Sequence, residues 1–177
     1  MSAHEVARLP RTGIGVDVHA FAAPDSGREL WVGGLLWPGE VGLEGHSDAD
    51  VACHAACDAL FSAAGIGDLG THFGVGRPEW EGASGSRLLG EAARLVREAG
   101  YEIAFAGQKT YNGVALLSRE RASDVVKNIT GFADEQARVI AGTVDGVRVI
   151  GVVEHLLRPN EIGGPAAADY SVIFPSR

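Results

Sequence analysis

The sequence has few of the features of a secreted, membrane or nucleic-acid-binding protein. Only two cysteines, Cys53 and Cys57, occur among 177 residues, which argues against a disulfide framework and favours a reducing cytoplasm. No apolar run approaches the roughly 18 residues that a membrane span needs, and the first residues, MSAHEVARLPRTG, lack the hydrophobic block of a signal peptide. The formal net charge of −8 argues against a sequence-independent nucleic-acid binder, whose binding face is basic. We therefore expect a cytoplasmic protein whose partner is a small molecule.

Length and composition suit one globular domain. The chain is 46% hydrophobic and 21% charged, which is ordinary for a soluble protein with a full-sized core. We expect residues 1–11 to form a disordered N-terminal extension and residues 12–177 to form the domain. The two cysteines lie four residues apart in a predicted helix, so we interpret them as small buried apolar side chains.

Hydrophobic periodicity predicts strands and helices that alternate along the chain. Strands are expected at 12–21, in a glycine-interrupted hairpin at 29–45, and at 101–108, 147–153 and 168–174. Helices are expected at 47–65, 86–100 and 118–129, the last with an extension through 133–141. The first helix is expected to begin at Ser47, because Asp50 follows three residues later as in a capping box. This order predicts an α/β (α+β) single domain with one mixed sheet packed on helices.

Asp17 and His19 are polar side chains within an apolar run, GVDVHAF, at 15–21. In a strand, residues i and i+2 project from the same face. Two buried polar side chains cost several kcal/mol unless other groups pair with them. The two residues are therefore either satisfied by neighbouring groups or are the first two ligands of a metal ion.

A second polar cluster, HSDADVACH, occupies 46–54. Acidic residues favour the positive end of a helix, which explains Asp48 and Asp50 but leaves His46 unexplained. His54, together with the D-x-H pair, gives one carboxylate and two imidazoles. That set suits zinc or another divalent ion with an open coordination position, as in catalytic rather than structural sites.

Three blocks of the sequence occur in a characteristic order and spacing: GVDVHAF, GHSDADVACHAACDAL and SAAGIGDLGTHF. They resemble the 2-C-methyl-D-erythritol 2,4-cyclodiphosphate synthase family of the non-mevalonate isoprenoid pathway, over residues 12–100. The resemblance implies a homotrimer of small α/β subunits with active sites between subunits. It also implies a metal-dependent phosphorus–oxygen lyase: a phosphate of a 4-diphosphocytidyl polyol phosphate attacks the β-phosphorus, CMP leaves, and a cyclic diphosphate forms.

The resemblance also implies roles for individual residues. The implied ligands of Zn²⁺, or of another divalent ion such as Mn²⁺, are Asp17, His19 and His54, and Glu154 is the implied ligand of a second ion, Mg²⁺. Catalytic roles fall on His46, Ser47 and Asp68. The implied substrate-binding residues are Asp17, His19, His46, Ser47, Asp68, Gly70 and Lys109.

The second half of the chain departs from the family pattern. Val152 and Val153 stand where two threonines are expected, and Glu161 stands where an arginine is expected. Each donor lost from a phosphate site costs about 1.5–3 kcal/mol if its hydrogen bond was charge-assisted. Whether the pathway substrate is still used is therefore open at this level.

Three alternatives follow from these departures. One is a paralogue that keeps the trimer and metal but acts on a different phosphorylated or nucleotide substrate. Another is a non-catalytic ligand-binding trimer, although buried Asp and His side chains without a task are costly. The third is a mononuclear zinc hydrolase, which needs a general base such as His46 or Asp50.

Overall fold

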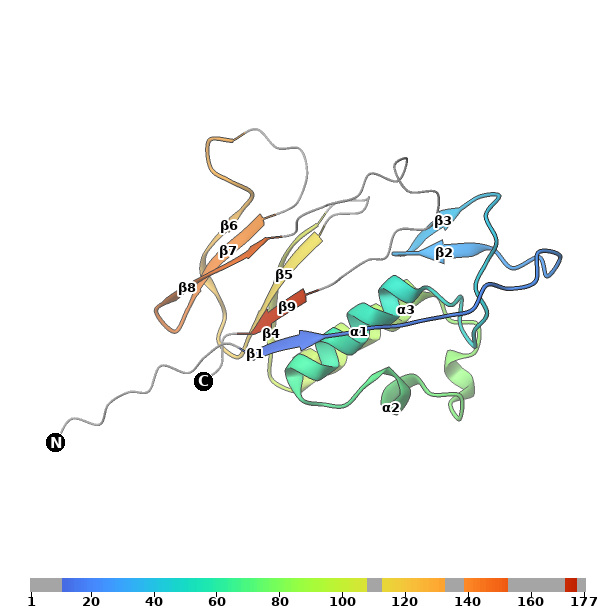
Figure 1. Ribbon diagram of the computed structural model, residues 1–177. Helices are drawn as coiled ribbons and strands as arrows, with labels where there is room; N and C mark the ends of the chain where they lie inside the picture. Colours follow the sequence, from blue (N-terminus) through green and yellow to red (C-terminus); the bar gives the residue numbers. More distant parts are fainter. Residues whose placement is uncertain (1–10, 108–112, 133–138, 153–170, 175–177) are drawn as a thin grey trace.

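The computed structural model describes residues 11–107, 113–132, 139–152 and 171–174 (Figure 1). Within these ranges the predicted alternation of strands and helices is wrong, because the helices follow one another between an N-terminal and a C-terminal group of strands. The elements in chain order are β1 (Arg11–Ile14), β2 (Leu30–Val32), β3 (Leu35–Trp37), α1 (Val51–Ala64), α2 (Leu69–Phe73), the 3₁₀ helix η1 (Pro78–Trp80), α3 (Gly85–Glu98), β4 (Glu102–Gly107), β5 (Gly113–Ser118), β6 (Ser123–Lys127), β7 (Val139–Val144), β8 (Val147–Val152) and β9 (Ser171–Phe174). None of the helices in these ranges is long and apolar enough to span a membrane.

The strands within the described ranges form three sheets rather than the single mixed sheet that the periodicity predicts. A four-stranded sheet has the order β1-β9-β5-β4, and it is mixed because β5 and β9 run parallel while its other pairs are antiparallel. β2 and β3 form a separate hairpin, and β6, β7 and β8 form a three-stranded antiparallel sheet. The prediction of a mixed α/β domain is confirmed, whereas the prediction of one sheet is wrong.

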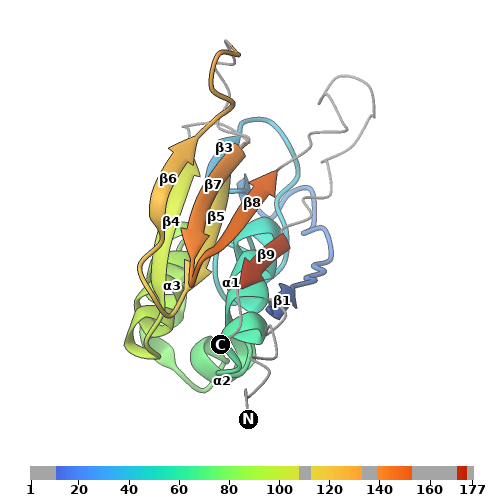
Figure 2. The same ribbon diagram turned by 90° about the vertical axis from the view of Figure 1, so that its left-hand side faces the viewer.

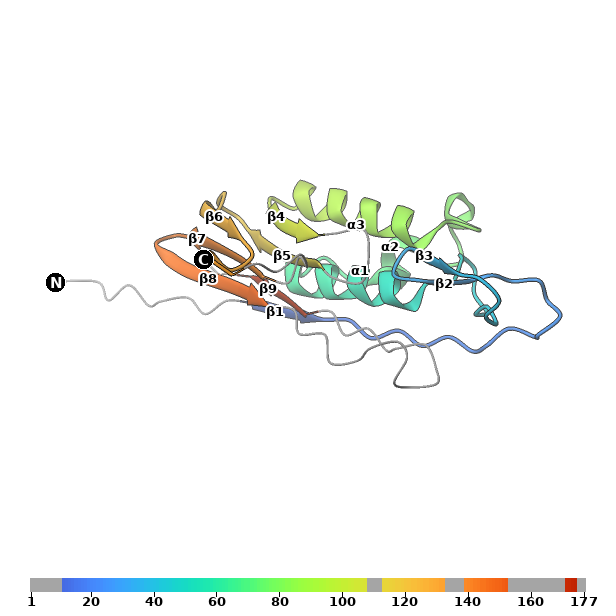
Figure 3. The same cartoon turned by 90° about the horizontal axis from the view of Figure 1, so that it is seen from above.

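The four-stranded sheet lies between two layers, which explains why the strands do not join into one sheet. On one face, Leu117 and Ile103 pack against α1 and α3, which lie side by side (Figure 3). On the other face, Leu116 packs against Ile140 of β7. The three-stranded sheet therefore stacks on the four-stranded one, face against face, because this buries apolar side chains that edge pairing would leave exposed (Figure 2).

The helix predicted over 118–129 is wrong, since β6 occupies the middle of that range. Val125 and Val126 are β-branched and favour a strand, and β6 pairs antiparallel with β7. Asn128 has a φ of 63°, a left-handed conformation that ends regular structure beyond the strand. Residues 133–138 of the predicted extension lie outside the described ranges, and the next residues begin β7.

The helices predicted at 47–65 and 86–100 are confirmed with changed boundaries. α1 begins four residues later than expected, because the side chain of Asp50 rather than that of Ser47 caps its backbone. It ends as predicted at Gly65, whose φ of 70° is the left-handed conformation of a helix C-terminus. Its cysteines are buried, and burial raises the pKa of the Cys57 thiol to about 12, which agrees with their interpretation as apolar side chains.

Candidate metal centre

The segment that carries Asp17 and His19 lies directly on α1. A Cβ atom on Gly15 would stand 1.8 Å from the carbonyl oxygen of Ala55, and one on Gly13 would stand 2.0 Å from that of Ala59. Only glycine allows so close an approach between two backbones. The contact between these two glycines and the alanines of α1 therefore fixes the position of Asp17 and His19 along the helix.

The strand predicted over 12–21 ends at Ile14, earlier than expected. Beyond it, the side chains continue to alternate between exposed and partly buried positions. Val16 and Val18 are 75% and 85% exposed, whereas Asp17 and His19 are half-buried. The polar residues thus point inward and the valines outward. The expected alternation holds, and within the described ranges this stretch pairs at the single bridge from Phe21 to Leu43.

Asp17, His19 and His54 converge on one point. Oδ2 of Asp17 lies 3.0 Å from Nδ1 of His54 and 3.1 Å from Nε2 of His19, and those two nitrogens are 3.2 Å apart. Among the described residues, this is the one group of three such side chains whose ligand atoms all lie within 4.8 Å of one another. The structure therefore brings together the residues in which the sequence suggests a metal site.

The remaining nitrogen of each histidine also has a partner. Nδ1 of His19 hydrogen-bonds the backbone carbonyl of Glu44, which can only accept. Nε2 of His54 lies 3.0 Å from Oγ of Ser47. If each of these nitrogens carries its proton, Nε2 of His19 and Nδ1 of His54 present lone pairs toward Asp17. This arrangement orients metal-binding imidazoles and fixes their tautomers.

The environment of Asp17 favours its ionised form. In the metal-free protein, where Nδ1 of His54 donates to Asp17 instead of facing an ion, burial raises the pKa of this carboxyl. That hydrogen bond and the charges of His54 and His19 oppose burial more strongly, so the pKa lies below its usual range. A carboxylate and two oriented imidazoles form a donor set for zinc. Tetrahedral zinc with bonds of 2.0–2.1 Å separates its ligand atoms by about 3.3 Å, close to the separations seen here, so the three residues fit the ion.

Asp50 and Ser47 lie at the start of α1, next to the point where Asp17, His19 and His54 converge. The Asp50 carboxylate is fully buried and accepts hydrogen bonds from the backbone of Ala52 and Cys53 in α1 and of Gly33 and Gly34 in the β2–β3 turn. Because its oxygens are buried and already accept these bonds, the carboxylate is not accessible to a substrate or a water molecule. This overturns the hydrolase alternative in which Asp50 is the general base.

The remaining predicted site residues with described positions lie on loops and helix starts. His46 is exposed, directly before the buried Ser47. Asp68 is exposed and caps α2, with Oδ1 2.7 Å from the backbone nitrogen of Thr71, and Gly70 lies in the first turn of that helix. Lys109 and Glu154 fall outside the described residues, so their predicted roles stay predictions.

Sequence reasoning missed Asp58, which links the two groups of predicted site residues. It lies one turn beyond His54 on α1, and its Oδ1 accepts a hydrogen bond of 2.6 Å from the backbone of Leu69, between Asp68 and Gly70. Burial raises the pKa of Asp58, and the charges of Asp68 and Asp17 raise it further. Its i, i+4 spacing from His54 places it on the same face of α1 as the centre, but the spacing does not reveal its bond to the backbone of Leu69.

Gly15→Ala is expected to disrupt the centre through the backbone. The new Cβ must move the 13–19 segment away from α1, so we expect the free energy of unfolding measured in urea to fall by about 1–3 kcal/mol. Zinc titration should show weakened binding. Gly90→Ala is the matched control: it lies exposed on α3 with nothing near its added Cβ and should stabilise by about 0.5–1 kcal/mol. Wild-type stability in the Gly15 variant would contradict the close approach.

Asp58→Asn is expected to change how stability depends on pH in the metal-free protein. The carboxyl titrates at higher pH in the folded state than in the unfolded state. The free energy of unfolding of the wild type therefore falls relative to that of the variant as pH rises from about 4, the unfolded pKa, through the folded pKa, and the difference between the two proteins is constant below about pH 4. Urea unfolding of both proteins from pH 3.5 to 8 measures this difference, and a constant difference across the range would contradict it.

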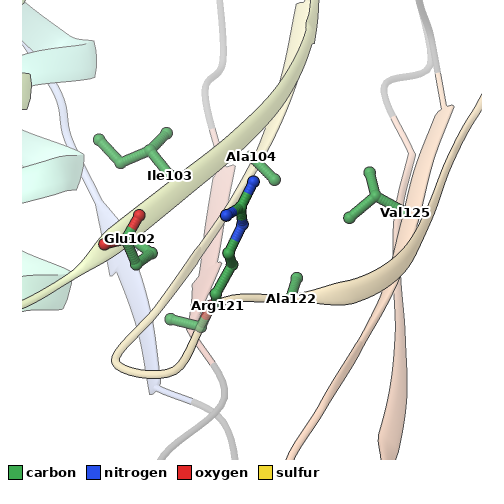
Figure 4. Close-up of a pocket in the computed structure, with 7 residues that line it drawn as sticks. Glu102, Ile103, Ala104, Arg121, Ala122 and Val125 are labelled. Atoms are coloured by element: carbon green, nitrogen blue, oxygen red, sulfur yellow. The ribbon is translucent and has the colours of Figure 1, made fainter.

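A separate hollow of about 250 Å³ lies between β4 and β6. Glu102, Arg121 and Val125 are among the residues that line it (Figure 4). None of the residues lining this hollow is a predicted site residue, so it is distinct from the convergence point on α1.

Comparisons with known proteins identify the family of the chain. Residues 10–157 match the YgbB family. The chain is 47% identical over 171 residues to the 2-C-methyl-D-erythritol 2,4-cyclodiphosphate synthase of Acidothermus cellulolyticus, covering 97% of this chain and 98% of the relative. It is 55% identical over 94 residues to the enzyme of the same name from Cutibacterium acnes, covering 52% of this chain and 54% of that one. The chain belongs to the YgbB family.

Proposed function

We propose that the protein is a 2,4-cyclodiphosphate synthase, a metal-dependent phosphorus–oxygen lyase. It converts the 4-diphosphocytidyl derivative of a polyol phosphate to a cyclic diphosphate. An oxygen of the polyol's own phosphate attacks the β-phosphorus, and the bond from that phosphorus to the oxygen bridging it to the α-phosphorus breaks. CMP leaves with that oxygen, and no water is consumed.

The observation that carries this proposal is the convergence of one carboxylate and two oriented imidazoles in a member of this family. Asp17, His19 and His54 would hold zinc, with Mn²⁺ as an alternative ion. When bound there, zinc supplies positive charge that polarises phosphate oxygens. The protein's own residues contribute mainly positioning and electrostatics rather than covalent chemistry.

The residues around the centre have complementary tasks in this proposal. Glu44 and Ser47 hold the two imidazoles in their ligating orientations. His46, exposed beside them, contacts the substrate's phosphate. Asp68 and Gly70 bind the polyol, at the start of a helix whose backbone Asp58 ties to α1. Lys109 is proposed to bind substrate and Glu154 to hold a second ion, Mg²⁺.

The proposal includes a cytoplasmic homotrimer with active sites between subunits. Support comes from the outer face of the segment that carries the centre, where Ile14, Val16 and Val18 are 75–85% exposed. Apolar side chains gathered on one surface are typical of a subunit interface. The inward side of the same segment then carries the site, so the centre lies close to that surface.

Incubation with the 4-diphosphocytidyl derivative of 2-C-methyl-D-erythritol 2-phosphate, zinc and magnesium tests the proposal. We expect equimolar CMP and cyclic diphosphate, with no oxygen from ¹⁸O-labelled water in either product. Release of inorganic phosphate with labelled oxygen would instead identify a hydrolase. No CMP at high protein concentration would favour the paralogue with another substrate.

A further inference from the structure

We infer that Arg28 is a positioning residue of the metal centre, because its guanidinium fixes the segment 43–47 that orients both histidines. The inference rests on the proposed function, since it concerns how well the protein holds the metal. The hydrogen bonds of the Arg28 guanidinium go to backbone carbonyls of this segment and not to the side chains of Asp17, His19 and His54. Its action passes through the backbone of the segment.

The guanidinium holds the segment at both ends. Nε of Arg28 donates to the carbonyl of Leu43 at 2.7 Å, and Nη2 donates to the carbonyl of Ser47 at 2.8 Å. Between these two points the carbonyl of Glu44 bonds His19, and at the second point the hydroxyl of Ser47 meets His54. One side chain therefore controls the backbone that supplies the outer partner of each imidazole.

The segment has little other regular structure to hold it. It belongs to neither a helix nor a multi-residue strand. Its backbone hydrogen bonds to the described residues include that from the amide of Glu44 to the carbonyl of Ala20 at 2.8 Å and that from the amide of Gly82 to the carbonyl of His46 at 2.9 Å. Gly42, just before it, passes so close that an added Cβ would lie 2.5 Å from the carbonyl oxygen of Arg28. Segment and arginine are therefore packed against each other, backbone to backbone.

Two bonds in these directions need a guanidinium. Its nitrogens form a rigid planar fork that reaches two acceptors at once, whereas a lysine ammonium is a single point on a flexible stem. Arg28→Lys keeps the positive charge but reaches one carbonyl at most. Arg28→Met removes both donors and keeps an unbranched side chain. Comparing the two variants shows whether the planar shape of the guanidinium or only its positive charge matters.

The test measures zinc dissociation constants of the wild type, Arg28→Lys and Arg28→Met by competition with a chromophoric chelator. Loss of a group that orients metal ligands typically weakens binding 10- to 100-fold, so we expect about 10-fold in both variants. Arg119→Met is the control, because Arg119 also donates to a backbone carbonyl, that of Ala99, but beside Tyr101 rather than the centre. Its zinc affinity should equal that of the wild type. Circular dichroism of each variant checks that it is folded.

A double-mutant cycle with Ser47→Ala distinguishes positioning from a general loss of stability. If Arg28 acts through Ser47, the two changes are less than additive in zinc affinity, whereas independent effects on folding add. Wild-type affinity in both Arg28 variants, or full additivity with Ser47→Ala, overturns the inference while leaving the proposed function intact. A wild type that binds no zinc overturns the proposed function and this inference with it.

Discussion

His54→Ala is expected to abolish stoichiometric zinc binding and to lower the rate of CMP release at least about 10³-fold while the subunit stays folded. The change removes one of three protein ligands, whose Nδ1 lies 3.0 Å from Asp17. The metal's stabilisation of developing phosphate charge amounts to several kcal/mol, and about 4 kcal/mol corresponds to 10³-fold in rate. Alanine favours helix, and the hydroxyl of Ser47 keeps the hydrogen bond that it accepts from the backbone of Ala49 at 3.1 Å, so the loss of its contact with His54 costs only about 1 kcal/mol.

The measurement is zinc content after dialysis, together with single-turnover CMP release and circular dichroism. Ser62→Ala is the matched control, because Ser62 lies on the same helix with its side chain exposed. It should retain both zinc and activity. Full turnover by the His54 variant after metal stripping would remove this residue, and the centre with it, from the mechanism.

Asp50→Ala is expected to be among the most destabilising single changes in the chain, at about 2–4 kcal/mol in urea unfolding. Loss of a helix N-cap typically costs about 1 kcal/mol. The backbone groups of Gly33 and Gly34 lose the same acceptor, at a further cost of about 1 kcal/mol or more between them. Because His54 lies in the first turn of α1, the change should also weaken zinc binding.

Asp68→Ala provides the comparison for stability, since Asp68 also caps a helix but is exposed and holds only the five-residue α2. Water replaces an exposed acceptor, so we expect a loss of at most about 1 kcal/mol there. Equal losses at the two positions would contradict the view that Asp50 joins the β2–β3 turn to α1.

The convergence of Asp17, His19 and His54 could be predicted from sequence because these residue types are rare in their surroundings. Asp17 and His19 interrupt an apolar run, and His54 follows a cluster of acids and histidine. The reason that they meet was less visible, because it lies in Gly13 and Gly15. A glycine that admits a neighbouring backbone looks in sequence like any flexible glycine.

Other parts of the structure depend on tertiary contacts that periodicity does not encode. The 118–129 stretch carries charges at spacings compatible with a helix, yet its valines pair with β7, and the second sheet buries Ile140 against Leu116. Arg28 and Asp58 were missed for a related reason. Each acts on the backbone of a distant segment, and a backbone acceptor or donor leaves no residue type to recognise.

X-ray absorption at the zinc edge of the zinc-loaded wild type tests the central claim most directly, namely that one carboxylate and two imidazoles bind a single ion. We predict one zinc per chain in a four-coordinate shell of nitrogen and oxygen at about 2.0–2.1 Å, with the multiple-scattering signal of two imidazoles. A sulfur shell at about 2.3 Å, which would implicate Cys53 or Cys57, or a spectrum without imidazole would contradict it.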